Sequence, residues 1–365
     1  MKTFFDDPAL NDIDTKLHNG DRLDETDGLL LYRSHDLVGI GRLADRVRRQ
    51  RHGRNAYFVY NQHLNYTNVC RNRCRFCAFA RDRGEKGAYT FSNEDVTRWL
   101  TSRMDQPIRE IHIVGGLNPS LPFDYYLTML QTIQSIRPRA VIKAFTAVEI
   151  DFLSEISGLS LDETIIKLKN AGLSMVPGGG AEVMSERVRL ELFPRKISGD
   201  RWLDIMATLH RHGITSNATM LYGHIETIEE RVSHLVRLRE QQDKTGGFTA
   251  FIPLAFHSQN TDLAHLPPTT AVDDLKTVAI ARLMLDNIDH IKAYWVMIGE
   301  KLAQVALSFG ADDLDGTIME ERITHMAGAT SAKGLTRKAL EHMIRSAGFK
   351  PVERDSFYNP IREAA

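Results

Sequence analysis

Short apolar runs alternate with longer amphipathic stretches along most of the chain. About eight runs are rich in apolar and β-branched residues, and segments of roughly twelve to twenty residues with helical periodicity separate them. The predicted strands span residues 65–69, 110–114, 141–147, 173–176, 216–222, 249–255, 292–297 and 314–319. This alternation predicts repeated βα units and therefore a parallel sheet.

Capping residues mark several boundaries of the intervening helices. Ser92 and Thr227 each precede acidic residues, as N-terminal caps do. Gly172, Gly213 and Gly246 close predicted helices, because glycine tolerates the left-handed conformation that ends a helix. Eight such units predict an α/β fold, either a TIM-type (β/α)8 barrel or a partial barrel, with its chemistry at the C-terminal ends of the strands.

The pattern also predicts how the chain is divided. Residues 1–60 precede the βα alternation and are expected to form a helical N-terminal extension. The barrel is expected to span residues 61–348, and residues 349–365 to form an irregular C-terminal tail packed on it. Since no low-complexity linker or break in composition interrupts the alternation, one main domain is the simpler prediction.

Composition narrows the classes of function. A net charge of -1 over 365 residues argues against a surface built to bind nucleic acid or an anionic membrane. Six arginines between residues 42 and 54 have acidic neighbours and no aromatic platform, so they are expected on a solvated helix face. No run of about 18 apolar residues occurs, and the first residues are acidic where a secretion signal is basic, so a cytoplasmic location is expected.

The chain has only three cysteines, Cys70, Cys74 and Cys77, and they follow the first predicted strand. Thiolates at this spacing can bind three corners of a [4Fe-4S] cluster and leave the fourth iron open. A structural zinc ion needs four protein ligands, and neither His63 nor His112 has zinc-finger spacing to the thiols. Three arginines alternate with the cysteines, which predicts an exposed, positively charged loop that favours thiolates.

The Cys-x3-Cys-x2-Cys spacing, with Phe76 before the last cysteine, resembles the signature of the radical S-adenosylmethionine (SAM) superfamily. The resemblance implies that the open iron binds the amino and carboxylate groups of S-adenosyl-L-methionine, which the reduced cluster then cleaves. It also implies that Phe76, helped by Phe79, lies against the adenine of this cofactor. Phe79 could equally be an ordinary core residue.

Other strand ends carry further candidate residues. By the same resemblance, Gly115 and Gly116 bind the methionyl amino group, and Thr146 and Glu182 bind other parts of the cofactor. A tight βα turn would also explain the two glycines, and Glu182 could instead cap the next helix. The candidate catalytic residues are Lys143, Glu226 and His257, although Lys143 could also be an outward-facing strand residue.

Several longer phrases are similar to the aminofutalosine synthase family of the futalosine route to menaquinone. They begin at Asn65, Gly115, Lys143, Pro177 and Ala218, and the similarity covers about residues 40 to 350. The resemblance implies that the 5'-deoxyadenosyl radical adds to the double bond of 3-[(1-carboxyvinyl)oxy]benzoate, with rearrangement and decarboxylation. S-adenosylmethionine would be a co-substrate, and flavodoxin or ferredoxin would supply the electron.

The dianionic substrate of that family needs partners for its two carboxylates. Lys143 and His257 are the candidates, because cationic or hydrogen-bonding groups bind buried carboxylates strongly. The alternatives are a cyclic dehypoxanthine futalosine synthase or an F420-chromophore synthase, both of which abstract hydrogen, or a non-catalytic metal protein. A nucleic-acid-modifying enzyme is disfavoured by the near-zero net charge.

Overall fold

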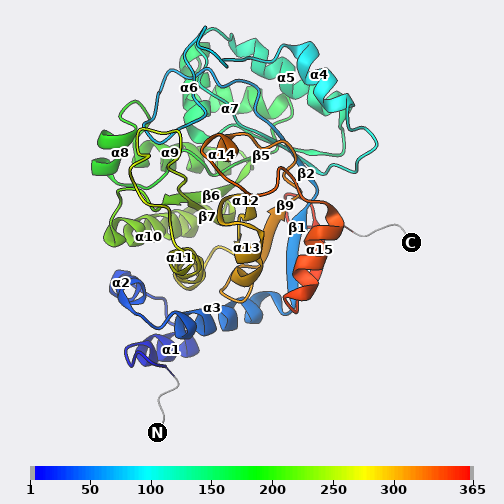
Figure 1. Ribbon diagram of the computed structural model, residues 1–365. Coiled ribbons are helices and arrows are strands. Elements are labelled where there is room, and N and C mark those ends of the chain that lie inside the picture. Colours follow the sequence, from blue (N-terminus) through cyan, green and yellow to red (C-terminus); the bar gives the residue numbers. More distant parts are fainter. Residues whose placement is uncertain (1–4, 362–365) are drawn as a thin grey trace.

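The main sheet curls into a barrel of parallel strands (Figure 1). The computed structural model describes residues 5–361; residues 1–4 and 362–365, at the outer ends of the predicted extension and tail, lie outside the described residues. Seven strands pair in chain order: β2 (Asn61–Leu64), β3 (Glu110–Ile113), β4 (Val141–Ala144), β5 (Met175–Val176), β6 (Thr215–Tyr222), β7 (Phe248–Ala255) and β8 (His290–Ile291).

Helices connect these strands, as the periodicity predicts. They are α4 (Asn93–Thr101), α5 (Phe123–Ile136), α6 (Ala147–Ser157), α7 (Leu161–Asn170), α8 (Glu186–Leu192), α9 (Gly199–Arg211), α10 (Ile228–Thr245) and α11 (Ala271–Met284). Four further helices follow the last of these strands: α12 (Trp295–Ile298), α13 (Glu300–Ala306), α14 (Ile323–Met326) and α15 (Arg337–Ser346). Ser92 and Thr227 cap α4 and α10, and Gly246 ends α10 in the left-handed conformation, as predicted.

A second, three-stranded parallel sheet lies beside the barrel, in the order β10 (Lys350–Arg354), β1 (Asn55–Val59), β9 (Asp313–Gly316). The segment around β9 spans the gap between the first and last barrel strands. Asp313 bridges to Lys292 just after β8, and Met319 bridges to Gln62 on β2. The gap in the partial barrel is therefore bridged by a segment that belongs to the other sheet. The predicted irregular tail differs from the structure, because residues 350–354 of that tail form β10.

The N-terminal helices α1 (Leu10–Asn19), α2 (Glu25–Arg33) and α3 (Leu37–His52) form the predicted helical lead-in, drawn in blue below the barrel in Figure 1. Helix α3 packs against α11, and α2 packs against α10 and α11. The arginines of α3 are only partly solvated: Arg48 is fully buried and donates to the Gly53 carbonyl over 2.7 Å. Across residues 5–361 no helix is both long and apolar enough to cross a membrane.

Three predicted strands differ from the structure. Residues 65–69 form no regular strand, because their backbone pairs through isolated bridges, Thr67 with Thr90 and Val69 with Arg81. Residues 292–297 lie beyond β8, and 295–298 form α12. The predicted strand 314–319 corresponds to β9, which pairs with β1 instead of forming an eighth strand of the main sheet. The five predicted strands between residues 110 and 255 are confirmed with adjusted ends.

Alternation along the strands decides which side chains enter the barrel. In β3, Ile111 and Ile113 are fully buried against the helices, so His112 between them points into the barrel. The neighbouring strand places Lys143 inward in the same way. Polar side chains therefore line the interior while the hydrophobic core fills the layer between sheet and helices.

Candidate active site

One cavity of about 330 Å³ opens at the C-terminal ends of the barrel strands. Its wall contains nearly all the residues that the sequence suggests for the site: Cys70, Cys74, Phe76, Cys77, Phe79, Gly115, Gly116, Lys143, Thr146, Glu182 and His257. The cysteine loop lines one end, and side chains from β2, β3 and β4 line the other. Of the predicted residues, only Glu226 does not line the cavity.

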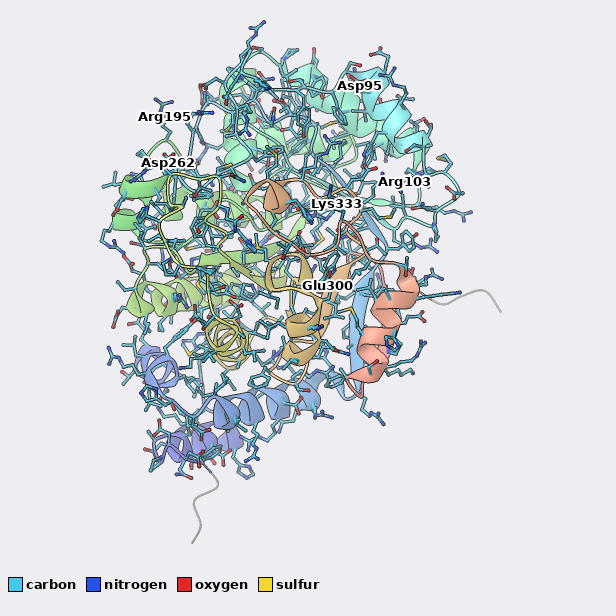
Figure 2. All side chains as sticks on the ribbon, in the orientation of Figure 1. Asp95, Arg103, Arg195, Asp262, Glu300 and Lys333 are labelled. Atoms are coloured by element: carbon cyan, nitrogen blue, oxygen red, sulfur yellow. The ribbon has the colours of Figure 1, made fainter. Side chains whose placement is uncertain are left out.

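The cysteine loop is fixed by backbone hydrogen bonds to distant segments. The Arg71 amide donates to the Leu117 carbonyl over 3.0 Å, and the Arg75 amide donates to the Leu192 carbonyl over 2.9 Å. Two exposed residues labelled in Figure 2 add to these contacts: Arg195 donates to the Arg71 carbonyl, and the Asp262 amide donates to the Arg75 carbonyl. The loop is thus held between three other parts of the barrel mouth.

The charge around the thiols differs from the prediction. Arg71 and Arg73 pair with acidic residues on the outside of the loop, and Arg75 donates to the Glu191 carbonyl. Burial raises the pKa of Cys74 to about 12 and also raises that of Cys77. The arginines therefore do not create a thiolate-favouring site, and the thiols would lose their protons on binding a metal, as coordinating thiols do.

Lys196 is the cation whose charge acts on Cys74 and Cys77, and sequence reasoning missed it. Its ammonium pairs with Glu182 and lies 5.0 Å from the centroid of the Phe76 ring. Because Lys196 follows the cysteine loop by about 120 residues in the chain, no local motif indicates it. Phe76 also meets Phe193 edge to face, with the ring centroids 5.7 Å apart.

The number of thiols tests which metal group they fit. Cys70, Cys74 and Cys77 are free cysteines, and all three line the same cavity. A structural zinc ion takes four protein ligands. Three thiolates can each bind one iron of a [4Fe-4S] cube and leave the fourth iron open, so this set of donors fits the cluster.

The two glycines after β3 are required by packing. A Cβ at Gly116 would lie 2.2 Å from the Val69 carbonyl oxygen, and one at Gly115 would lie 2.6 Å from the Tyr66 ring. The Gly115 amide donates to the Glu149 carboxylate over 3.0 Å, so this donor is already used within the protein. Close packing against the Tyr66 ring and the Val69 backbone therefore explains these two glycines.

Glu149 is a buried carboxylate in the cavity wall. It accepts hydrogen bonds from the Tyr66 hydroxyl over 2.9 Å and from the Thr146 amide over 2.7 Å. Burial raises its pKa to about 7. Thr146 caps the N-terminus of α6 through its side chain, and it also lines the cavity.

Glu182 follows the triple glycine after β5 and adopts a left-handed conformation, with φ of 52°. It does not cap the next helix, because Ser185 caps α8. Two of the three glycines before it are tightly packed: a Cβ at Gly178 would lie 2.5 Å from the Asn217 carbonyl oxygen, and one at Gly180 would lie 2.7 Å from the Val148 side chain. The loop places Glu182 in the cavity wall, where Lys196, from the segment after α8, pairs with it.

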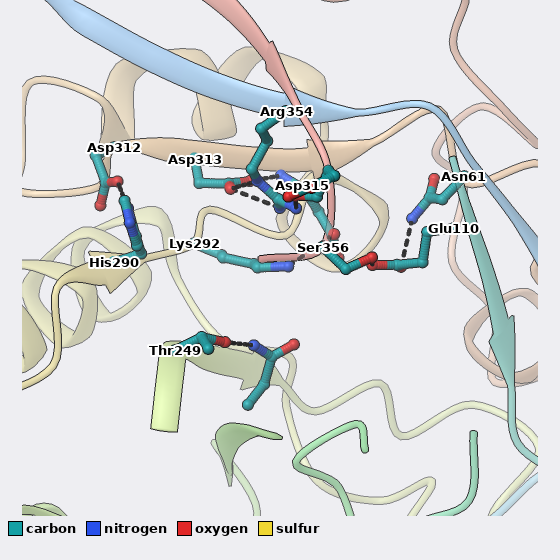
Figure 3. A network of polar contacts seen from close by, with 12 residues as sticks. Asn61, Glu110, Thr249, His290, Lys292, Asp312, Asp313, Asp315, Arg354 and Ser356 are labelled. Carbon is teal, nitrogen blue, oxygen red and sulfur yellow. Dashed lines mark hydrogen bonds and ion pairs between the residues drawn. The ribbon is translucent and has the colours of Figure 1, made fainter. Parts of the chain in front are cut away.

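Lys143 lies at the inner end of the cavity and is almost fully buried, which excludes an outward orientation. Its ammonium is 3.3 Å from the Glu110 carboxylate, and burial lowers its pKa to about 8. Glu110 also accepts hydrogen bonds from Asn61 and from Ser356 of the C-terminal segment (Figure 3). Chain from both ends of the protein thus fixes the carboxylate that holds Lys143.

His257 lines the cavity with its Nε2 donating to the Met297 carbonyl over 2.8 Å. Because a carbonyl only accepts, Nδ1 of the neutral ring is an acceptor, and the ring must be protonated to donate to a carboxylate there. Glu226 instead accepts from the Gly223 amide over 2.6 Å and pairs with His224 and Arg231, with its side chain fully buried. Its position does not support the prediction that it is catalytic.

Two sequence families match separate parts of the chain. The radical SAM superfamily matches residues 64–238, and the family described as the CofH/MqnC C-terminal region matches residues 245–364. The superfamily match contains the cysteine loop, and both matches contribute to the cavity wall.

Similarity to individual proteins extends over almost the whole chain. An aminodeoxyfutalosine synthase of Thermus thermophilus is 46% identical and covers 98% of this chain and 97% of its own. One of Streptomyces coelicolor is 41% identical, covering 96% and 94%. A cyclic dehypoxanthine futalosine synthase of Halalkalibacterium halodurans is 37% identical, covering 94% and 93%. The crystal structure of methylornithine synthase has the same fold, with a TM-score of 0.72 at 16% identity over 92% of this chain and 96% of that one.

Proposed function

Because the chain belongs to the aminodeoxyfutalosine synthase family of radical SAM enzymes, we propose that it makes aminofutalosine. This family is the same one that the sequence motifs resemble, there called aminofutalosine synthase. The proposed reaction joins the 5'-deoxyadenosyl group of S-adenosylmethionine to 3-[(1-carboxyvinyl)oxy]benzoate, with aryl migration and loss of the carboxylate. This step would serve menaquinone biosynthesis in the cytoplasm, with a flavodoxin or ferredoxin as electron donor.

The observation that carries the proposal is the arrangement of one cavity with two chemically different ends. Three free cysteines lie at one end, and Lys143 lies at the other among imidazole rings. A reaction between the adenosyl group and an anionic aromatic acid needs both ends, held close together and shielded from water.

At the first end, Cys70, Cys74 and Cys77 would hold a [4Fe-4S] cluster through three of its irons. When bound, the cluster supplies the electron that breaks a carbon–sulfur bond of S-adenosylmethionine. The further residues assigned to S-adenosylmethionine are Phe76 and Phe79 beside the adenine, with Gly115, Gly116, Thr146, Glu182 and Lys196 around its polar groups.

At the second end, Lys143 and His257 are assigned to the two substrate carboxylates. The ammonium has three donors, of which one is directed at Glu110, so others remain for a ligand. Substituting Lys143 with methionine should raise the apparent KM for the benzoate sharply while iron content stays unchanged. Unchanged kinetics in this variant would contradict the assignment.

The test of the function is an anaerobic incubation of cluster-reconstituted protein with S-adenosylmethionine, dithionite and 3-[(1-carboxyvinyl)oxy]benzoate, followed by mass spectrometry. A product that contains both adenine and benzoate is expected, and the Cys74→Ala variant should not form it. Free 5'-deoxyadenosine and methionine without this adduct would instead indicate a hydrogen-abstracting relative, such as the cyclic dehypoxanthine futalosine synthase or the F420-chromophore synthase.

A further inference from the structure

Three side chains that can carry positive charge form one row across the inner end of the cavity. His63 on β2 is the register partner of His112 on β3, and His112 is the register partner of Lys143 on β4. All three line the cavity. The two imidazole rings are stacked, with centroids 4.4 Å apart and planes within 9°.

The histidine pair has hydrogen-bonding capacity that the described protein does not use. His63 is 5% exposed, and its Nε2 is buried without a hydrogen-bond partner among the described residues. A buried polar atom normally has a partner, because leaving it unpaired costs free energy. Since His63 lines the cavity, a bound ligand is the natural partner for this nitrogen.

Each buried cation near the row already has an acidic partner. Lys143 lies 3.3 Å from Glu110, and Lys292 lies 3.0 Å from Asp315, as Figure 3 shows for the second pair. Glu321, on the cavity wall, pairs with His325 over 3.0 Å. A buried anionic ligand must be neutralised, and these pairs leave no surplus positive charge among the described residues at this end.

From this charge balance we propose that the stacked His63–His112 pair takes up one proton when the substrate binds, and that the resulting imidazolium binds a substrate carboxylate. The inference rests on the proposed function, since it takes the substrate to be a dianionic aromatic acid. No bond between heavy atoms forms or breaks in this step. A proton from solvent moves to a ring nitrogen, and the carboxylate accepts a hydrogen bond from the pair.

The surroundings of the pair are consistent with neutral rings in the ligand-free protein. Burial lowers the pKa of both His63 and His112. Four charged groups face them: Glu110 from β3, Lys143 from β4, Asp315 from β9 and Glu321 from the following loop. Because two stacked imidazolium rings would repel each other, the pair accepts one proton and titrates as a unit.

Calorimetry can test the proposal without turnover. The cluster-reconstituted protein, with S-adenosylmethionine and no reductant, is titrated with 3-[(1-carboxyvinyl)oxy]benzoate in two buffers of different ionisation enthalpy. Uptake of about one proton per site is expected, with Kd weakening about tenfold per pH unit above the pKa of the free pair. The double variant His63→Gln/His112→Gln keeps amide donors that do not titrate, so proton uptake should vanish and Kd should lose its pH dependence.

Single phenylalanine variants measure the hydrogen bond. His63→Phe keeps a stacked ring without nitrogens and should weaken Kd roughly 10- to 100-fold, the range for hydrogen bonds to charged groups. His63→Gln should restore much of the loss. His342→Phe, on α15 and away from the cavity, is the matched control and should bind as the wild type does. Iron content and S-adenosylmethionine binding should be unchanged in all of them.

The outcomes separate this inference from the proposed function. Adduct formation without proton uptake, or uptake that persists in the double glutamine variant because another group such as His257 takes the proton, would overturn the inference and leave the function intact. Failure of the wild-type protein to bind the benzoate would overturn both. Proton uptake that disappears in the double variant supports the inference.

Discussion

Replacing Gly116 with alanine should separate the end of β3 from the cysteine loop. A Cβ there would lie 2.2 Å from the Val69 carbonyl oxygen and 3.0 Å from the Cβ of Cys70. Carbon and oxygen atoms in close non-bonded contact stay about 3.3 Å apart, so the two backbones would have to move apart by about 1 Å. The same movement would lengthen the 2.9 Å hydrogen bond from the Gly116 amide to the Thr67 carbonyl.

The cost follows from what must move. Overpacking in a core typically costs about 1–3 kcal/mol, and the upper end applies because the obstructing atoms are backbone. Weakening the hydrogen bond adds up to about 1 kcal/mol. We therefore expect Gly116→Ala to lower the free energy of unfolding by about 3–4 kcal/mol, which is roughly 100- to 1,000-fold in the folding equilibrium.

Urea unfolding of the reduced protein without its cluster measures this cost, and iron content after anaerobic reconstitution measures the effect on the loop. Gly179→Ala is the matched control in the same cavity, because its Cβ would meet only the Thr146 methyl group, at 3.3 Å. A Gly116→Ala protein as stable as the control, with full iron content, would refute the argument that this glycine sets the position of Cys70.

Three further predictions concern buried charge. Arg354→Met removes the partner of the buried Asp313 carboxylate and should lower the free energy of unfolding by about 3–5 kcal/mol. Arg345→Met, which removes an exposed ion pair on α15, is the control and should change it by less than about 1 kcal/mol. Urea denaturation compares the two variants. Because burial raises the pKa of Glu149 to about 7, the folded protein binds a proton there that the unfolded chain has already released. The wild type should therefore lose about 2 kcal/mol of stability relative to Glu149→Gln as pH rises from about 5 to 7, and equal pH slopes would contradict this. Glu226→Gln should lower stability by about 2–4 kcal/mol and leave turnover per iron-loaded molecule unchanged; loss of turnover at unchanged stability would restore a catalytic role.

Several features were predictable because they depend on short stretches of chain. The cysteine spacing and the caps at Ser92 and Thr227 are local patterns, and the structure places each as expected. The sequence left open whether Lys143 faces inward, and the structure places it in the cavity wall. Strand ends were less predictable. Residues 65–69 have the composition of a strand, but their backbone pairs with Thr90 and Arg81, further along the chain, through isolated bridges instead of a continuous ladder.

By itself the sequence determined the βα order, the candidate cluster ligands and the family to which the chain belongs. Only the tertiary structure decided that Lys196 pairs with Glu182 in the cavity wall, that His63 stacks on His112, and that Glu226 faces Arg231 instead of the cavity. The physical reason is the range of the contacts. Periodicity and motif spacing act within a few residues, whereas these pairings depend on which strands and loops the folded barrel brings together.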